Sequence, residues 1–214
     1  MKYFVLTAIL LTLFVYHTPA NGSGSAAEID HLAIATIMIY DGRYEKAEAE
    51  LSRVDPSSEE IDTANYYTLR GVLDSKMNRS ESAIINYLHA VDLTKDKTFL
   101  APSSPKLKKK YFFSIGKSKS EKISVIEYDG EKVKKEELEK LHLYLAKEYY
   151  KIQDYANTAL HLDYAGNRGS DRPALFTLRA DCYWSLKQFD EAIHSINMGL
   201  IRFPENAALL KQKY

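Results

Sequence analysis

The residue types that most often carry out chemistry are few in this 214-residue chain, and their spacing matches no common reactive site. The six histidines follow neither the H-E-x-x-H pattern nor a metal-ligand spacing from Cys182, the only cysteine. A single cysteine also excludes an intrachain disulfide framework. We therefore expect no metal site and no cofactor.

Signatures of nucleotide-dependent and hydrolytic enzymes are missing as well. The sequence has no phosphate-binding P-loop, no dinucleotide-binding fingerprint and no G-x-S-x-G nucleophile elbow. Cys182 lacks a companion thiol, and we interpret it as a small packing residue rather than a nucleophile. The sequence thus predicts a protein without catalytic activity.

The charge balance restricts the class of partner. Lys and Arg together number 29, and Asp and Glu also number 29, so the formal net charge is zero. A chain that binds nucleic acid over a uniformly basic surface is therefore not expected, although a local basic patch is compatible with these numbers. Apolar residues make up 45% of the chain and charged residues 27%, which argues for a globular rather than a disordered protein.

The N-terminal segment has the pattern of a secretory signal. Lys2 precedes an uncharged apolar run from Tyr3 to Tyr16, which is shorter than the roughly 20 residues of a membrane-spanning helix. Small residues in Thr18-Pro19-Ala20 favour cleavage after Ala20, and Ser25-Ala26-Ala27 offers a second site. We therefore predict a signal peptide over residues 1–20, or up to 27, and an exported protein that is periplasmic or secreted. The alternative is an uncleaved segment that anchors the chain in a membrane.

An internal period organises the rest of the chain. Residues 149–158 align with residues 183–192 at a shift of 34, and residues 41–47 align with residues 77–83 at a shift of 36. Each block is a turn flanked by apolar residues at helical spacing, so each predicts a helix–turn–helix hairpin.

This pattern resembles the tetratricopeptide repeat (TPR) family, and the last unit carries the resemblance best. Counted from Pro173, that unit has the family's residue types at Phe176, Ala180, Tyr183, Phe189, Ala192 and Pro204. A third unit starting near Glu139, a second near Ala64 and a first near Glu28 match the pattern in part. The resemblance implies an all-α, right-handed solenoid of about four helical hairpins, in which His31 and His142 occupy a packing position.

The tyrosine content has a structural interpretation in such a stack. Six of the 16 tyrosines stand at pattern positions, namely Tyr44, Tyr67, Tyr87, Tyr149, Tyr155 and Tyr183. Paired helices could approach closely at the small residues Ala35, Gly71, Ala146 and Ala180 and at Ala47, Ala83 and Ala192. Large side chains such as Phe189 would fill the space left between them. We therefore expect much of the aromatic excess to be core rather than a binding site.

A stretch between the second and third units fits no repeat. Pro102 and Pro105 end the preceding helix, and Lys106 to Lys122 contains seven lysines and one glutamate. Residues 111–116 and 123–128 are strand candidates, Asp129-Gly130 is a turn signal, and residues 134–140 begin the next helix.

Three interpretations of this stretch remain open. One is a β-hairpin or loop insertion whose lysines are solvated and discourage aggregation. Another is an anion-binding patch made by Lys106, Lys108, Lys109, Lys110, Lys117, Lys119 and Lys122. The last is a divergent fifth helical hairpin.

The resemblance also implies a partner-binding surface, because the first helix of each TPR hairpin lines a concave groove. The matching positions are Lys140, Leu143, Lys147 and Tyr150 in the third unit and Ala174, Thr177, Asp181 and Trp184 in the fourth. Trp184, the only tryptophan, would then anchor a partner. Alternatively, Trp184 packs under the C-terminal segment 207–214, which we expect to form a short cap.

These observations divide the chain into a signal segment at 1–20, two repeats at 28–97, the basic insertion at 98–138, two repeats at 139–206 and a cap at 207–214. We expect a non-catalytic scaffold or adaptor that binds another protein or a peptide in an extracytoplasmic assembly, as in a bacterial envelope. The alternative is a module that binds an anionic surface or polyanion through the lysine-rich insertion, with contact to a membrane surface. Nucleic acid is not an expected partner, because we expect the chain to be exported.

Overall fold

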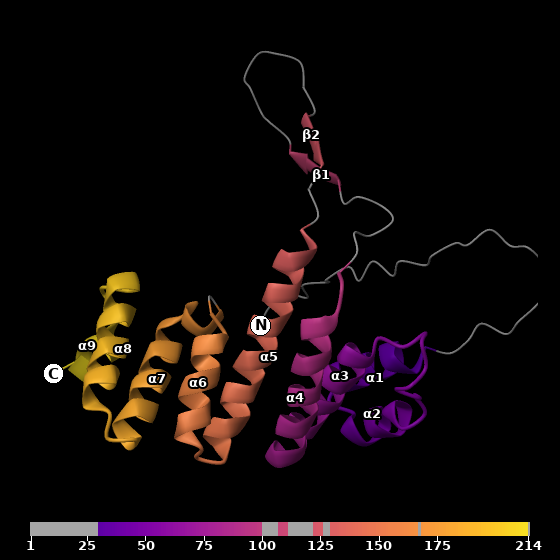
Figure 1. Ribbon diagram of the computed structural model, residues 1–214, viewed down its shortest axis with the longest axis horizontal. Coiled ribbons are helices and arrows are strands. Elements are labelled where there is room, and N and C mark those ends of the chain that lie inside the picture. Colours follow the sequence, from indigo (N-terminus) through magenta and orange to yellow (C-terminus); the bar gives the residue numbers. More distant parts are fainter. Residues whose placement is uncertain (1–29, 100–106, 111–121, 126–128, 167, 214) are drawn as a thin grey trace, which may run out of the picture. The chain divides into compact units, whose positions relative to one another are not determined.

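The computed structural model in Figure 1 describes residues 30–99, 107–110, 122–125, 129–166 and 168–213. The predicted signal segment lies outside these residues. Within them, no helix combines the length and the apolar character that crossing a membrane requires.

The described helices form four consecutive hairpins followed by a short helix (Figure 1). The hairpins are α1 (His31–Tyr40) with α2 (Tyr44–Leu51), α3 (Thr63–Lys76) with α4 (Ser80–Asp96), α5 (Gly130–Lys151) with α6 (Tyr155–Tyr164), and α7 (Pro173–Ser185) with α8 (Phe189–Arg202). The 3-10 helix η1 (Arg168–Ser170) joins α6 to α7, and α9 (Ala207–Lys213) follows α8. From α1 to α8, each helix contacts the next one along the chain, so hairpin stacks on hairpin. The predicted series of four helical hairpins is thereby confirmed.

The turn that closes each hairpin has the same backbone geometry. One residue in it has a positive φ angle: Asn78 (59°), Gln153 (61°) and Lys187 (61°), with Gly42 (74°) in the first hairpin. The N–H of the residue after it donates to the carbonyl oxygen five residues earlier, as in Arg79 to Asp74 at 2.8 Å and Gln188 to Tyr183 at 2.9 Å. This bond belongs to the Schellman motif, which ends one helix and reverses the chain. The next helix then begins at the residue after the donor in all four hairpins.

Small residues let the paired helices pack closely, as the sequence predicts. A Cβ atom added to Gly71 of α3 would lie 2.5 Å from the ring of Tyr87 in α4, so only glycine leaves room for that ring. Tyr87 is buried, and its neighbours on α4, Ala83 and Ala90, are fully enclosed. The alanines at the other small pattern positions are buried too: Ala35, Ala47, Ala146, Ala180 and Ala192.

The remaining aromatic pattern residues depart from the expected core in one respect. The other five tyrosines are half-buried, whereas Phe189 is exposed. Phe189 opens α8, and within the described residues no complete hairpin packs on the outer side of that helix. The expectation that Phe189 fills the core is therefore wrong, because a repeat residue is buried by the following repeat as well as by its own.

The basic insertion contains a short antiparallel ladder in its described part. β1 (Leu107–Lys110) pairs with β2 (Lys122–Val125), and the register sets Leu107 opposite Val125 and Lys110 opposite Lys122. The strand expected at 123–128 overlaps β2, whereas the strand expected at 111–116 lies outside the described residues. Part of the lysine run itself forms β1.

Helix α5 begins at Gly130, earlier than the expected start at residue 134. The carboxylate of Asp129 accepts a 3.0 Å hydrogen bond from the backbone N–H of Lys132 and thereby caps the helix. The expected turn at Asp129-Gly130 is therefore wrong, because aspartate favours helix N-caps as much as turns. The early start gives α5 22 residues and extends it beyond the repeat that begins near Glu139.

Candidate functional site

Two of the predicted partner-binding residues border a hollow where α7, α8 and α9 meet. The hollow has a volume of about 420 Å³ and is called here the end hollow. It is lined by Ala180, Asp181, Trp184, Ala192, Ile193, Ile196, Asn197, Gln212 and Lys213. Its base is apolar, because Ala180, Ala192 and Ile196 belong to the buried cluster that joins α7 to α8 and α9.

Trp184 forms one wall of the end hollow and remains 62% exposed. Its ring meets the ring of Phe189 edge to face, with 4.8 Å between centroids. Helix α9 contributes Gln212 and Lys213 to the same hollow, so it flanks Trp184 instead of covering it. The expectation that Trp184 packs under the C-terminal segment is therefore wrong for the described part of that segment, which ends at Lys213 and leaves the indole exposed.

Asp181 provides the polar side of the end hollow. Its Oδ1 atom accepts a 2.6 Å hydrogen bond from Nε2 of Gln212, which ties α7 to α9. Partial burial raises the pKa of Asp181, although the hydrogen bond from Gln212 opposes this shift. Burial, followed by the negative charge of Asp181, also raises the pKa of Tyr150 on α5. Tyr150 of the third hairpin and Asp181 of the fourth therefore interact electrostatically.

The other predicted partner-binding residues do not line the end hollow. Lys140 pairs with Glu137 on its own helix, and Nζ of Lys147 lies 5.8 Å from the ring centroid of Tyr144. The hydroxyl of Thr177 donates a 2.9 Å hydrogen bond to the carbonyl oxygen of Ala174. Leu143 is buried in the core between α5, α6 and α7, so it is unsuited to receiving a partner.

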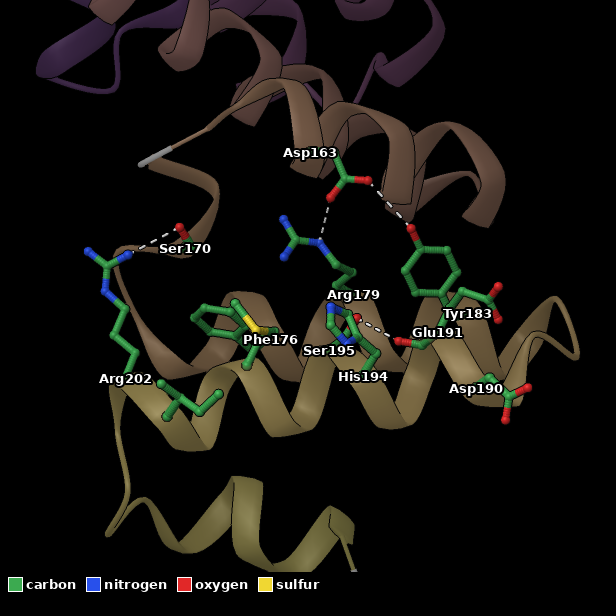
Figure 2. A pocket seen from close by; sticks show the side chains of 12 residues that line it. Asp163, Ser170, Phe176, Arg179, Tyr183, Asp190, Glu191, His194, Ser195 and Arg202 are labelled. Carbon is green, nitrogen blue, oxygen red and sulfur yellow. Dashed lines mark hydrogen bonds and ion pairs between the residues drawn. The ribbon is translucent and has the colours of Figure 1, made fainter.

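Sequence reasoning missed a larger groove on another side of the same hairpin, which Figure 2 shows from close by. This side groove has a volume of about 890 Å³ and is bounded by α6, η1, α7 and α8. Its lining comprises Asp163, Ser170, Phe176, Arg179, Tyr183, Asp190, Glu191, His194, Ser195, Met198, Ile201 and Arg202. The exposed Met198 and Ile201 on α8 were the available sequence signal, but apolar residues at helical spacing are usually core.

Several polar and charged residues of the side groove bond across its helices. Nε of Arg179 lies 3.0 Å from Oδ1 of Asp163, whose other oxygen accepts a 3.4 Å hydrogen bond from Tyr183. Arg202 donates a 3.3 Å hydrogen bond to the hydroxyl of Ser170. These pairs hold α6 and η1 against α7 and α8, so their first role is to join the third hairpin to the fourth.

Reactive chemistry is not evident in the described part of the chain. No group of three or more His, Cys, Asp and Glu side chains is placed there to hold a metal ion. Burial raises the pKa of the Cys182 thiol to about 11, so the thiolate that a nucleophile requires is scarce at neutral pH. His142 and His161 contact each other through Nδ1 atoms 3.0 Å apart, and burial lowers the pKa of both.

The predicted anion-binding lysines are only partly within the described residues. Lys108, Lys109 and Lys110 belong to β1 and Lys122 to β2, whereas Lys106, Lys117 and Lys119 lie outside the described residues. The antiparallel register brings Lys110 and Lys122 to facing positions of the ladder.

Comparison with known proteins supports the fold. No family model matches the chain, and no curated protein is detectably similar to it. Among solved structures it is similar to the APC/C hetero-tetramer Cut9-Hcn1 (14% identity, TM-score 0.51), covering 86% of this chain but only 28% of that chain. It is also similar to MamA AMB-1 (14% identity, TM-score 0.54, covering 85% and 82% of the two chains). A MamA RS-1 ArsTM double mutant gives 10% identity and a TM-score of 0.56, covering 87% and 83%. Together with the repeat pattern and the four hairpins, these similarities show that the chain has a tetratricopeptide-repeat-like fold.

Proposed function

We propose that this protein is a non-catalytic scaffold or adaptor that binds another protein through the end hollow. The observation that carries the proposal is an aromatic side chain, Trp184, that is 62% exposed beside an apolar hollow. Large aromatic anchors at the edge of an apolar pocket dominate the binding free energy of many protein interfaces. The TPR-like fold supports the same role, since stacked helical hairpins expose long surfaces to partners.

The end hollow has the features of a surface that receives a helix. In the last three hairpins, the fifth residue of the second helix is Ile84 in α4, Ala159 in α6 and Ile193 in α8. Ile84 and Ala159 are 7% and 3% exposed, and Ile84 packs against Leu141 and Leu145 of the next helix, α5. Ile193 is 56% exposed, because α9 covers only part of the corresponding face of α8. A partner that contributes an amphipathic helix would bury Ile193 as α5 buries Ile84.

The surroundings of the end hollow add polar specificity. Asp181 and Gln212, joined by their hydrogen bond, stand at one side, and Lys213 stands near the end of α9. Polar groups at the rim of an apolar patch orient a partner and discriminate against others. One of the structurally similar proteins, Cut9-Hcn1, is a hetero-tetramer, which agrees with a role for this fold in assembly.

Photo-cross-linking in the native host tests this function. Replacing Trp184 with the photoreactive residue p-benzoylphenylalanine should yield a cross-linked partner that mass spectrometry identifies. Tyr40 of α1, which is also highly exposed and aromatic, is the matched control position. The same partner captured equally from both positions, or no partner from position 184, would contradict binding at the end hollow.

We further propose that the assembly is extracytoplasmic, as the N-terminal pattern of Lys2 and the apolar run 3–16 favours. Sequencing the N-terminus of the protein isolated from its host should then find Asn21 or a residue up to Glu28. An intact Met1 would instead favour the membrane-anchored alternative.

A second function, binding to an anionic surface, is favoured by the ladder of β1 and β2. Its register sets Lys110 opposite Lys122, so lysines of both strands are gathered in one short ladder. An anionic membrane surface would neutralise them. Replacing Lys108, Lys109 and Lys110 with Gln should abolish binding to phosphatidylserine vesicles, whereas the exposed lysines Lys46, Lys187 and Lys211 changed to Gln should leave it intact. Binding that both triple variants retain would exclude this function.

A further inference from the structure

Glu139 of α5 is a buried acid without a partner among the described residues. Three acidic residues are buried in the described part of the chain: Asp74, Glu139 and Glu148. Asp74 lies 2.7 Å from Arg79 and accepts a 2.8 Å hydrogen bond from Asn86. Glu148 is likewise satisfied by Ser75 and Lys151. Glu139 is only 6% exposed, yet no described residue donates a hydrogen bond to its carboxylate or forms an ion pair with it.

An unpaired buried carboxylate is costly, because it loses its hydration without gaining a compensating charge or donor. A buried polar group without a protein partner is met by water, an ion or a ligand. The Glu139 oxygens are not among the buried atoms left without a partner, so solvent in the bordering pocket reaches them, and a ligand with a donor of its own could take the place of that solvent.

The carboxylate borders a pocket into which a donor could enter. The pocket has a volume of about 540 Å³ and is called here the Glu139 pocket. It is lined by Glu131, Lys134, Lys135, Leu138, Glu139, His142, Tyr164, Gly166 and Ser170. A Cβ atom at Gly166 would lie 2.6 Å from Oε1 of Glu139, so glycine at this position leaves the space that the carboxylate occupies. The N-terminal extension of α5 supplies one wall, and Tyr164, Gly166 and Ser170 supply the other.

The other groups of the Glu139 pocket define the chemistry of the missing donor. Tyr164 is exposed, and its ring lies 5.2 Å from the ring of His142, so both present aromatic surface to the pocket. Burial, together with the charges of His161 and Lys95, lowers the pKa of His142 to about 4, so this ring is neutral at physiological pH and does not repel a cation. A planar cation can bind a carboxylate through two hydrogen bonds and stack on an aromatic ring at the same time.

We infer that the Glu139 pocket binds the guanidinium group of an arginine from a protein partner. Guanidinium matches a carboxylate and an aromatic face better than ammonium does, because it is planar and weakly hydrated. Lys134 and Lys135 line the same pocket and favour an acidic residue beside that arginine in the partner. This inference rests on the proposed role as a protein-binding scaffold, but it concerns a surface of α5, α6 and η1 that is separate from the end hollow.

One competing explanation uses only the chain itself. Lys135 stands four residues before Glu139 on α5, a spacing at which oppositely charged side chains can pair along a helix. If Lys135 swings onto Glu139 in solution, the carboxylate is satisfied and needs no ligand. Thermal unfolding separates the two explanations.

Stability measurements on the full chain provide the first half of the test. If Glu139 is unpaired, neither Glu139→Gln nor Lys135→Ala should lower the melting temperature. A lowered melting temperature in both variants would mean that Lys135 pairs with Glu139, and it would overturn the inference.

Binding of a designed peptide provides the second half. The probe is a fluorescein-labelled peptide of sequence GERER, and its control carries citrulline, the neutral isostere of arginine, at both arginine positions. The arginine peptide should bind the wild-type chain at least about tenfold more tightly than the citrulline peptide, and Glu139→Gln should remove that difference. Glu136→Gln, a change to an exposed carboxylate of the same helix outside the pocket, is the matched control and should retain it.

Three outcomes would overturn the inference. They are equal binding of the two peptides, no binding of either, and loss of discrimination in Glu136→Gln as well as in Glu139→Gln. Binding of free arginine amide as tight as that of the peptide would contradict the assignment to a protein partner. None of these results depends on Trp184 or the end hollow, so failure here and failure of the proposed function can be told apart.

Discussion

The hydroxyl of Ser75 in α3 donates a 2.6 Å hydrogen bond to Oε1 of Glu148 in α5. Nζ of Lys151 lies 2.8 Å from the same oxygen. Burial alone would raise the pKa of Glu148, but hydrogen bonds from Lys151, Ser75 and Ser80 hold it below its usual value. A buried carboxylate thus joins the second hairpin to the third, across the point where the basic insertion interrupts the repeats.

Replacing Glu148 with Ala should therefore destabilise the protein. The change leaves the Ser75 hydroxyl and the Lys151 ammonium without their buried partner, and we expect the free energy of unfolding to fall by about 2–4 kcal/mol. Urea denaturation followed by circular dichroism measures this loss. Glu137→Ala, which removes the exposed pair with Lys140, should cost less than about 0.5 kcal/mol. Equal losses in the two variants would contradict a structural role for the Ser75–Glu148 bond.

The contact of Gly71 with Tyr87 gives a prediction on packing. Gly71→Ala would set a methyl group 2.5 Å from the buried ring, so we expect a loss of about 1–3 kcal/mol despite the higher helix propensity of alanine. In a Tyr87→Leu background the ring is gone, and the same change should be neutral or stabilising. A double-mutant cycle in urea measures the coupling. Similar costs in both backgrounds would show that the ring does not limit residue 71.

The pair His142 and His161 predicts how stability depends on pH. The pKa of His142 is about 4 in the folded chain, against 6.5 for an unperturbed histidine, and that of His161 is lowered as well. The unfolded chain therefore binds protons more readily, so stability should fall as pH decreases below 6.5. Because His142 is only half-buried, we expect a loss of about 1 kcal/mol between pH 7 and pH 5.

Substitutions at these histidines test the assignment of that pH dependence. His142→Phe should flatten the decline measured by urea denaturation at pH 7 and pH 5. His194→Gln, which changes an exposed histidine of α8, should leave the decline as it is. A decline that persists in His142→Phe would mean that other groups cause it.

The repeat pattern predicted the four hairpins because it reports contacts within a repeat. Gly71 and Tyr87 meet through pairing inside one hairpin, and their types alone indicate a small residue facing a large one. The Asp129-Gly130 pair was misleading because the same residues favour turns and helix starts, and here Asp129 caps a helix.

Contacts between elements explain why the sequence could not predict the rest of the site. The burial of Phe189 and Ile193 depends on which element packs on the outer side of α8, so an identical repeat position is core in one hairpin and exposed in another. Leu143 was expected on a binding surface, but the neighbouring α6 and α7 enclose it. Glu139 resembled an ordinary helix residue, and the close approach of Gly166 to its carboxylate comes from a different part of the chain.

Trp184 is the only tryptophan in the chain and stands at the end hollow, so its fluorescence reports on that surface alone. The most direct test is a titration of the full chain with the partner captured from position 184, in which tryptophan emission is recorded. A segment of the partner that contains no tryptophan is used, so that all of the emission comes from Trp184. We predict a blue shift on binding, and an affinity at least about tenfold weaker for Ile193→Asp, which sets a charge where a helix should pack. Unchanged emission on binding, together with full affinity of Ile193→Asp, would contradict the assignment of the end hollow as the partner-binding surface.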